Sequence, residues 1–235
     1  MSRVVEAEAT EHPLLAMPRR DAAVTGLLVI VTAVLFVAMA NHTTRAPIQR
    51  LDDAFLRQMV AIRTPWLTKV ADTFNVLGLV VVTLPVRLLI AGYLALRRRW
   101  WHFSAFVSAI VLSEVSIGLL KTLYHRARPL GSLVHTSGGS FPSGHAVAAS
   151  VTAVAAVIAL FPEGPRRYAW GAAAVAFSLV MALSRAYLAA HWLSDAITGV
   201  LLGTSIALGT ALVVHQVRVR REAARPEVRV AEPAT

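Results

Sequence analysis

Long apolar runs separated by short polar connections dominate this chain of 235 residues. A helix of about 20 apolar residues, rising about 1.5 Å per residue, crosses the hydrocarbon core of a membrane. Six runs reach or approach this length, and they lie at 22–40, roughly 76–96, about 101–122, from His145 to near Phe161, about 168–187 and about 192–214. The pattern predicts an all-α, polytopic membrane protein with six transmembrane helices.

The connection between the first two runs, residues 41–73, has a mixed pattern. Apolar side chains recur among polar ones, at Phe55, Leu56, Met59, Val60, Ile62 and Trp66. This pattern is typical of an amphipathic helix that lies in the membrane interface. We expect a polar tail at 1–21, a membrane domain at 22–215 and a basic tail at 216–235.

Basic residues gather in alternate connections. Arginines lie at 97–99 between the second and third runs and at 166–167 between the fourth and fifth, and both tails are also basic. The positive-inside rule places these segments in the cytoplasm. The basic 41–73 connection argues the other way, but a long connection carries less weight. We therefore expect both termini in the cytoplasm, and the Ala/Val/Arg-rich composition favours a bacterial inner membrane.

Composition supports a membrane protein and excludes other classes. Hydrophobic residues make up 56% of the chain and charged residues only 15%, and the mean hydropathy is +0.61. A soluble domain carries about a quarter charged residues. The absence of cysteine excludes disulfides and thiolate metal sites. The net charge of +10 is spread over segment ends, which indicates topology signals and anionic lipid contact, with no nucleic acid partner.

Three short polar clusters lie at the ends of runs, opposite the basic connections. Ionisable residues near lipid are costly and usually functional. The third cluster, Ser184 to Asp195, contains His191 four residues before Asp195. On a helix these two share a face, so the carboxylate can fix the imidazole tautomer and leave the other nitrogen free as a nucleophile or base. A break between the fifth and sixth helices would bring Arg185 to them. The alternative is a His–Asp pair that caps a helix.

The other two clusters supply an anion site and cations. Ser143 is the expected N-cap of the fourth helix, whose free N–H groups can bind an anion, and His145 in that first turn can donate a proton. Lys121 and Arg128 are seven residues apart, so a continuous helix places both on one stripe, where they could grip one phosphate. Each cluster alone also fits a capped turn or side chains that snorkel to headgroups. Together the three indicate phosphate chemistry.

The clusters follow a recognisable order: Lys-x6-Arg-Pro from Lys121, Pro-Ser-Gly-His ending at His145, and Ser-Arg-x5-His-x3-Asp ending at Asp195. This order closely resembles the three-part signature of the type-2 phosphatidic acid phosphatase superfamily, and every signature position is filled. The resemblance implies a six-helix fold with the active site near the outer membrane surface. It also implies the roles of the site residues: phosphate binding by Lys121, Arg128, Ser143, Gly144 and Arg185, nucleophilic attack by His191, orientation of His191 by Asp195, and protonation of the leaving group by His145.

These roles agree with elementary phosphoryl-transfer chemistry, which depends on positioning and charge stabilisation. Three cations and a helix N-terminus supply both without a metal or a cofactor. A zinc site from His145, His191 and Asp195 has suitable ligand types, but the neighbouring cations oppose a divalent ion. Arg87 and Glu114 lie inside predicted spans and are expected to pair. His125, Arg126 and His135 lie near the clusters but fill no motif position.

The sequence therefore predicts a metal-independent hydrolase of lipid phosphates that acts at the extracytoplasmic face through a phosphohistidine. The family suggests a polyprenyl diphosphate, phosphatidylglycerol phosphate or phosphatidic acid, and the compact chain favours undecaprenyl diphosphate. One alternative is a phosphotransferase, in which a sugar or lipid hydroxyl replaces water. A second, of another class, is a lipid or anion transporter that uses the cations as a binding site. The sequence carries no signal for an oligomeric state.

Overall fold

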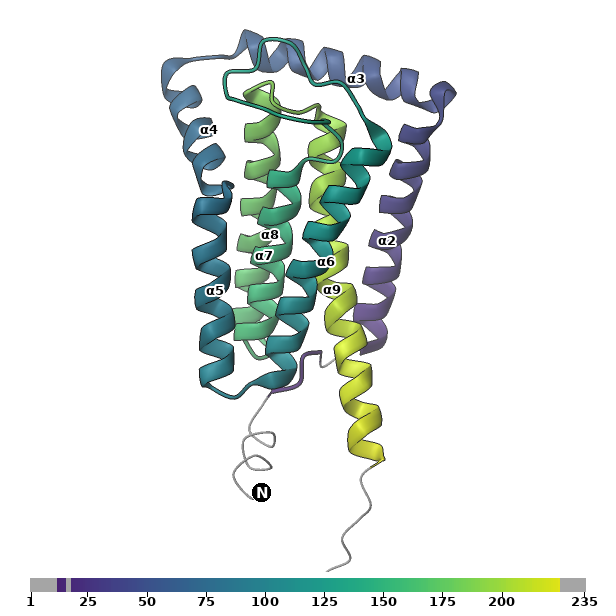
Figure 1. The fold of residues 1–235 in the computed structure, drawn as a ribbon, viewed down its shortest axis with the longest axis vertical. Coiled ribbons are helices and arrows are strands. Elements are labelled where there is room, and N and C mark those ends of the chain that lie inside the picture. The colour runs from purple at the N-terminus through teal and green to yellow at the C-terminus, as the bar shows by residue number, and fades with distance from the viewer. Residues whose placement is uncertain (1–11, 16–17, 225–235) are drawn as a thin grey trace, which may run out of the picture.

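The computed structural model describes residues 12–15 and 18–224, and within these ranges the chain is helical and has no strand. The helices of this part, labelled as in Figure 1, are α2 (Pro18–Ala40), α3 (His42–Ala61), α4 (Pro65–Leu77), α5 (Val80–Leu96), α6 (Trp100–Tyr124), α7 (Gly144–Leu160), α8 (Pro165–Tyr187) and α9 (Leu193–Ala223). The predicted all-α fold class is confirmed.

Helix α7 lies at the centre of a bundle and packs against α6, α8 and α9 (Figure 1). Helix α2 packs on α9, and α5 runs along α6. Helix α3 lies crosswise over one end of the bundle, and the α6–α7 and α8–α9 connections lie at that same end. The predicted basic connections, at 97–99 and 166–167, lie at the opposite end together with the last turns of α9 (Figure 1).

The central packing depends on small residues of α9. A Cβ atom on Gly203 would lie 2.6 Å from the carbonyl oxygen of Val147, and one on Gly199 would lie 2.8 Å from the carbonyl oxygen of Ser143. Both distances are too short for a real contact, so glycine at these positions allows the backbones of α7 and α9 to approach closely. Helix pairs in membranes commonly pack in this way.

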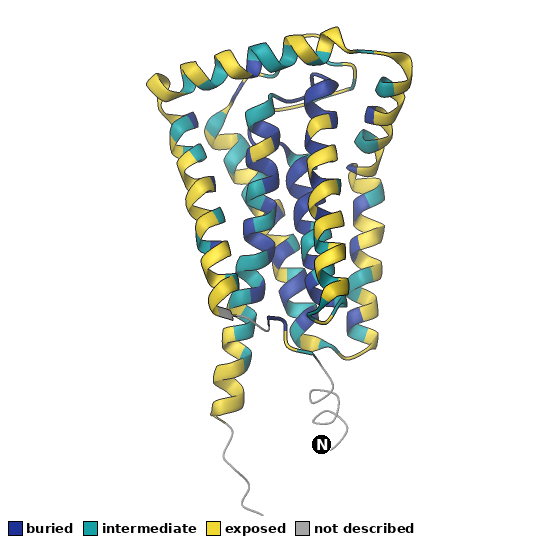
Figure 2. Cartoon of the chain, turned by 180° about the vertical axis from the view of Figure 1, so that it is seen from behind, coloured by how far each residue is buried: buried dark blue, intermediate teal, exposed yellow. Residues whose placement is uncertain are grey.

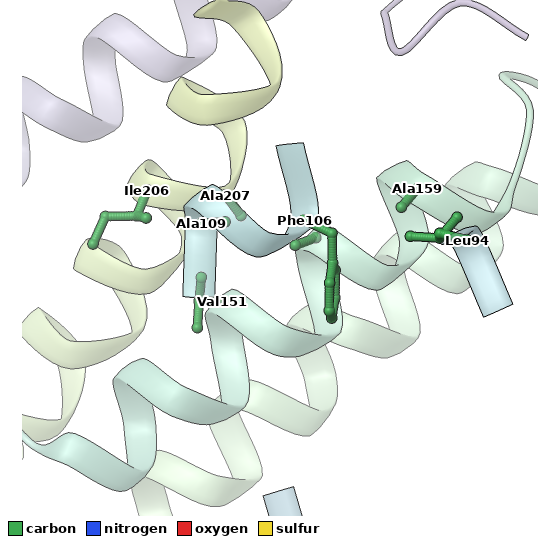
Figure 3. Packing of buried hydrophobic residues seen from close by; sticks show 8 residues of the cluster. Leu94, Phe106, Ala109, Val151, Ala159, Ile206 and Ala207 are labelled. Atoms are coloured by element: carbon green, nitrogen blue, oxygen red, sulfur yellow. The ribbon is translucent and has the colours of Figure 1, made fainter. Parts of the chain in front are cut away.

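An apolar core fills the middle of the bundle between α5, α6, α7 and α9. Figure 3 shows how its side chains meet: Leu94, Phe106, Ala109, Val151, Ala159, Ile206 and Ala207. Each of these is at most 9% exposed. Many core positions on α7 and α9 are alanine or glycine, so α7 lies close to its neighbours.

The outer faces of the peripheral helices are apolar as well. Val37, Val81 and Leu89 expose 68%, 72% and 74% of their surface, and Figure 2 shows exposed residues along the outer sides of the bundle. A helix that is hydrophobic all round belongs in a membrane when it is not buried in protein. These faces confirm the prediction of a membrane-embedded bundle.

Four helices of the described chain, α2, α6, α8 and α9, are long and apolar enough to span a membrane. Helices α4 and α5 form a fifth span if they are counted together, since they are bent by 52° at a short break. Helix α7 is apolar but shorter. Length and composition thus support four or five spans, and the predicted number of six depends on including α7.

The 41–73 connection differs from the single interfacial helix expected there. It forms α3 and the first part of α4, because Pro65 begins a new helix and the side chain of Thr64 caps its N-terminus. A proline is well placed in the first turn of a helix, where its missing N–H costs nothing.

The helices also extend beyond the predicted ends of the membrane domain. Helix α2 begins at Pro18 and α9 continues to Ala223. Leu14 and Leu15 are buried against α6, α7 and α9 within the segment expected as a polar tail. The remainder of the two predicted tails, at 1–11, 16–17 and 225–235, lies outside the described residues.

Candidate functional site

The three polar clusters converge at the end of the bundle that α3 covers. Each predicted residue has a distinct structural position: Lys121 in the last turn of α6, Arg128 in the α6–α7 connection, Ser143, Gly144 and His145 at the start of α7, Arg185 in the last turn of α8, His191 in the α8–α9 connection, and Asp195 in the first turn of α9. The sequence prediction that distant connections meet in one place agrees with this arrangement.

Arg128 reaches the site from a loop. Helix α6 ends at Tyr124, and its C-cap His125 has a φ of 40°, so the helix does not continue from Lys121 to Arg128. The chain turns back, and the guanidinium of Arg128 donates to three successive carbonyl oxygens of residues 137–139 at 2.7, 3.0 and 3.2 Å. It also donates to the carbonyl of Ala190 at 2.7 Å. Arg128 therefore ties the α6–α7 loop to the α8–α9 connection.

His191 has one nitrogen fixed and one directed at Arg128. Its Nδ1 lies 2.7 Å from the carbonyl oxygen of Ser140, and its Nε2 lies 3.1 Å from Nη1 of Arg128. A carbonyl can only accept, so Nδ1 carries the hydrogen and the lone pair of Nε2 faces the guanidinium. The backbone thus selects the tautomer whose Nε2 can act as a nucleophile.

Asp195 contributes to His191 at longer range than the sequence suggests. Its Oδ2 lies 3.7 Å from Nδ1 of His191, beyond hydrogen-bond distance. The two residues do not share a helix, because α8 ends at Tyr187 and α9 begins at Leu193. Ala189, with a φ of 53°, lies in this break. The chain therefore has a break between α8 and α9, the condition under which Arg185 was expected to approach His191.

Several polar atoms of the predicted phosphate site are buried without a hydrogen-bond partner among the described residues. They are Oγ of Ser143, Nε2 of His145 and Nε of Arg185. Ser143 is the N-cap of α7 as predicted, but its hydroxyl makes no capping hydrogen bond. Because buried polar atoms are normally paired, this group of atoms fits a site whose partner is an oxygen-rich ligand.

Lys121 and the start of α7 complete this site. A Cβ atom on Gly144 would lie 3.8 Å from Nζ of Lys121, so the ammonium group is next to the first turn of α7. His145 lies within electrostatic range of Lys121, Arg185 and His191. The helix N-terminus adds free N–H groups and a partial positive charge.

The break between α4 and α5 forms a wall of the site that the motifs do not include. Oδ1 of Asn75 accepts a hydrogen bond from Nη1 of Arg185, and the backbone of Asn75 contacts the ring of His145. A Cβ atom on Gly78 would lie 3.0 Å from Cγ of His145 and 3.2 Å from Cε of Met181. The sequence offers only a polar Asn and a Gly at the edge of an apolar run as signals for this contact.

A buried ionic network lies behind His191. Arg126 is 2% exposed, and its Nη1 pairs with Oδ1 of Asp195. Its Nη2 donates to Oδ2 of Asp52 and to Oε1 of Gln49, both at 2.6 Å. Asp52 on α3 also accepts from the backbone N–H of Ser194 at 2.9 Å and from its hydroxyl at 2.6 Å. From the sequence, Arg126 fills no motif position and could at most tune the choice of headgroup, and Asp52, which lies far from the motifs in the chain, was missed.

Burial controls the protonation of the two central groups. It lowers the pKa of His191 from its ordinary value of 6.5 to about 4, against the opposing effect of Asp195 and with further lowering by Arg128 and Arg185. Burial also lowers the pKa of Arg128, while Asp195 raises it. His191 is therefore neutral at physiological pH, as a nucleophile must be.

The other polar residues near the clusters lie outside this site. Nη1 of Arg87 pairs with Oε1 of Glu114 at 2.7 Å, as expected, and Nε of Arg87 donates to Thr152 at 2.9 Å. His125 and His135 are exposed on the α6–α7 connection. The arrangement as a whole offers a neutral imidazole, three cations and a helix N-terminus around one point, which suits attack on a phosphoryl group.

Comparison with known proteins gives consistent results. A family model described as the PAP2 superfamily matches residues 101–219. The chain is 31% identical over 175 residues to phosphatidylglycerophosphatase B of Bacillus subtilis, a match that covers 72% of this chain and 85% of that protein.

Two solved structures have a similar fold. The crystal structure of a transmembrane PAP2-type phosphatidylglycerolphosphate phosphatase from Bacillus subtilis matches with a TM-score of 0.68 and 25% identity, over 86% of this chain and 98% of that chain. The structure of Aquifex aeolicus LpxE matches with a TM-score of 0.57 and 23% identity, over 68% and 94% of the two chains. The second similarity supports the fold alone.

Proposed function

Because the chain belongs to the PAP2 superfamily and is a multi-pass membrane lipid phosphatase, a phosphoric-ester hydrolase, we propose that it removes the terminal phosphate of phosphatidylglycerol phosphate through a phosphohistidine at His191. The observation that carries this proposal is the geometry of His191. Its Nδ1 is held by the Ser140 carbonyl, and its Nε2 lies 3.1 Å from the Arg128 guanidinium that would bind phosphate.

In the first chemical step, the lone pair of His191 Nε2 forms a bond to phosphorus as the bond from phosphorus to the lipid oxygen breaks. Arg128 now donates a hydrogen bond toward Nε2. A phosphate oxygen that accepts this N–H instead would free the lone pair for attack. Lys121 and Arg185, with the start of α7, would stabilise the charge on the phosphoryl oxygens. His145, whose Nε2 has no partner among the described residues, enters this step protonated beside the bound phosphate anion, gives its Nε2 proton to the leaving oxygen and becomes a neutral imidazole.

In the second step, water replaces the histidine. The water oxygen bonds to phosphorus, its proton passes to His145, and the electron pair of the N–P bond returns to Nε2 of His191. Inorganic phosphate leaves, and both histidines regain their starting protonation. This sequence needs neither a metal nor a cofactor, because the positive charge comes from side chains.

The choice among lipid substrates rests on one observation. The Bacillus relative is a phosphatidylglycerophosphatase, and this similarity favours phosphatidylglycerol phosphate for this chain. Undecaprenyl or another polyprenyl diphosphate, the leading candidate from the sequence, stays a prediction as the second candidate.

The distribution of charge supports a proposal for which side of the membrane the site faces. The arginines at 97–99 and 166–167 lie at the end of the bundle opposite the candidate site. By the positive-inside rule this end faces the cytoplasm. We therefore infer that the site faces the extracytoplasmic side of a bacterial inner membrane and that both termini are cytoplasmic.

A phosphate-release panel tests this function. The purified protein in detergent is given phosphatidylglycerol phosphate, undecaprenyl diphosphate and phosphatidic acid, with EDTA present and absent. We expect the highest kcat/KM for phosphatidylglycerol phosphate, no loss with EDTA, and no release by the His191→Ala variant. His135→Ala, which changes an exposed histidine, should retain activity.

The same panel separates the alternatives. A higher kcat/KM for undecaprenyl diphosphate would replace the substrate proposal with its second candidate. Released phosphate that lacks the label of oxygen-labelled water would indicate transfer to another hydroxyl. Lipid movement without phosphate release, unaffected by His191→Ala, would indicate a transporter and contradict the mechanism.

A further inference from the structure

Arg126 holds both groups that face Nδ1 of His191. Its side chain pairs with Asp195, whose Oδ2 lies 3.7 Å from Nδ1. Its backbone carbonyl accepts a hydrogen bond from the N–H of Ser140 at 2.8 Å, and the carbonyl of Ser140 is the 2.7 Å acceptor of Nδ1. The side chain of Arg126 thus holds one neighbour of this nitrogen, and its backbone holds the other.

The Arg126 guanidinium is divided between two carboxylates. One terminal nitrogen pairs with Asp195 and the other with Asp52, and all three side chains are at most 2% exposed. A buried charge requires a partner, since the loss of one member of a buried pair leaves the other uncompensated. Both carboxylates also lie at the N-terminus of α9, where negative charge is favoured.

The charges of this network suit a histidine that becomes positive during the reaction. Two carboxylates and one guanidinium leave one excess negative charge next to His191. When Nε2 bonds to phosphorus while Nδ1 keeps its hydrogen, the imidazole ring becomes cationic. Asp195 then stabilises the cationic ring. This stabilisation is weaker the more fully Arg126 neutralises the Asp195 carboxylate.

We propose that Arg126 and Asp52 are positioning residues that divide one guanidinium between two carboxylates and so set how strongly Asp195 stabilises the charged form of His191. Asp52 does this from α3, so the helix that crosses the end of the bundle is part of the catalytic apparatus. The inference rests on the proposed function, because it assumes that His191 is the nucleophile.

Several other charged groups act on His191 and stay unchanged in the test. They are Arg128 from the α6–α7 connection, Arg185 from α8 and His145 from α7. A shift that follows a change at position 52 or 126 therefore reports on the network of Arg126, Asp52 and Asp195.

The test compares two isosteric or near-isosteric variants by their pH profiles. In Asp52→Asn, Arg126 pairs with Asp195 alone, so Asp195 stabilises the cationic ring less. We expect the acid limb of kcat/KM to move to lower pH by about half a pH unit to one unit, and kcat to fall about tenfold with KM nearly unchanged. In Arg126→Gln, Asp195 loses its neutralising partner, and the acid limb should move to higher pH.

Controls separate this role from folding and from the proposed function. Glu222→Gln changes a carboxylate at the far end of α9, which accepts a hydrogen bond from Arg218 at 2.8 Å, and should leave the limb in place. Melting temperature and chromatography in detergent report the folded fraction of each variant. His191→Ala tests the nucleophile by itself, so its failure to abolish turnover would refute the proposed function separately.

The opposite directions of the two shifts make the result decisive. If Arg126→Gln does not fold, the shift of the acid limb in Asp52→Asn alone tests the proposal. The double variant Asp52→Asn/Arg126→Gln loses one charge of each sign. It should fold and have an acid limb close to that of the unchanged protein. The proposal is overturned if Asp52→Asn has an unshifted limb and a kcat that falls only in proportion to the folded fraction. It is also overturned if KM rises while kcat stays constant.

Discussion

At the scale of single residues, the state of His191 follows from burial and hydrogen bonding. The ring is buried, its Nδ1–H donates a hydrogen bond to a backbone carbonyl, and nearby guanidinium groups oppose protonation. These effects keep Nε2 unprotonated under conditions in which an exposed histidine begins to charge. In the proposed mechanism, His191 would therefore stay available as a nucleophile in mildly acidic solution.

The pH dependence of turnover tests this state. Because burial lowers the pKa of His191 to about 4, the neutral ring is available above this pH and is lost as the pH falls through it. We predict an acid limb of kcat/KM near pH 4. The profile is first corrected for the second ionisation of the substrate phosphate, which occurs at about pH 6. If the acid limb lies near 6.5, the ordinary pKa of histidine, and is due to the enzyme and not to the substrate, the ring of His191 is hydrated and exposed.

The sequence could reveal the motif residues but not all of their partners. Lys121, Arg128 and Arg185 are visible because costly cations recur at the ends of apolar runs. The carbonyl of Ser140, which fixes the tautomer of His191, leaves no side-chain signal. Asp52 lies 143 positions before Asp195, and only the folding of α3 over the bundle brings the two to one guanidinium.

At the scale of helices, the break between α4 and α5 positions His145. Gly78 lies against the ring of His145, with no room for a Cβ atom. We predict that Gly78→Ala displaces the ring and lowers kcat by about tenfold to 10²-fold, since small misplacements of reacting groups are costly. Gly92→Ala, on the following helix α5 with open space around it, should retain activity. Equal activity of the two variants would show that the wall does not position His145.

The close approach of α7 and α9 has a different role, because it holds the bundle together. A Cβ atom on Gly203 would lie 2.6 Å from the carbonyl oxygen of Val147 and 3.0 Å from the backbone nitrogen of Val151. We predict that Gly203→Ala destabilises the protein by about 1–3 kcal/mol, as overpacking does. Gly26→Ala on α2, with nothing within 4 Å, is the control. Thermal unfolding in detergent measures both, and equal melting temperatures would contradict close packing.

The location of a helix could be predicted where a long apolar run marks it. The residues at which helices begin and end were harder to predict. The runs at 22–40 and about 101–122 correspond to α2 and α6, since hydrophobic length alone marks a span. The separation of α3 from α4 depends on Thr64 and Pro65, a local capping signal within a segment interpreted as one helix. The end of α6 depends on His125 in a left-handed conformation, which its residue type does not dictate.

At the scale of the whole molecule, charge is distributed unevenly between the two ends of the bundle, which predicts its orientation across the membrane. The candidate site and α3 occupy one end, and basic connections occupy the other (Figure 1). A lipid phosphate held at the site would then lie at the extracytoplasmic surface while its tail stays in the membrane.

The absence of native cysteine makes this direction measurable. Single cysteines are introduced at two exposed positions. His135→Cys lies near the site, and Arg98→Cys lies at the opposite end of the bundle. In intact bacterial cells we predict that a membrane-impermeant maleimide labels the first and not the second. The reverse labelling would place the site in the cytoplasm and refute the orientation.

The central claim is that His191 forms a covalent bond to phosphorus. The most direct measurement is a rapid-quench reaction with phosphatidylglycerol phosphate labelled with radioactive phosphorus in its terminal phosphate, stopped in alkali and analysed by peptide mass spectrometry. The account predicts an acid-labile, alkali-stable phosphoryl group on His191 that appears before free phosphate and is absent in His191→Ala. Label on another residue, or phosphate release from single turnovers without any labelled protein, would contradict it.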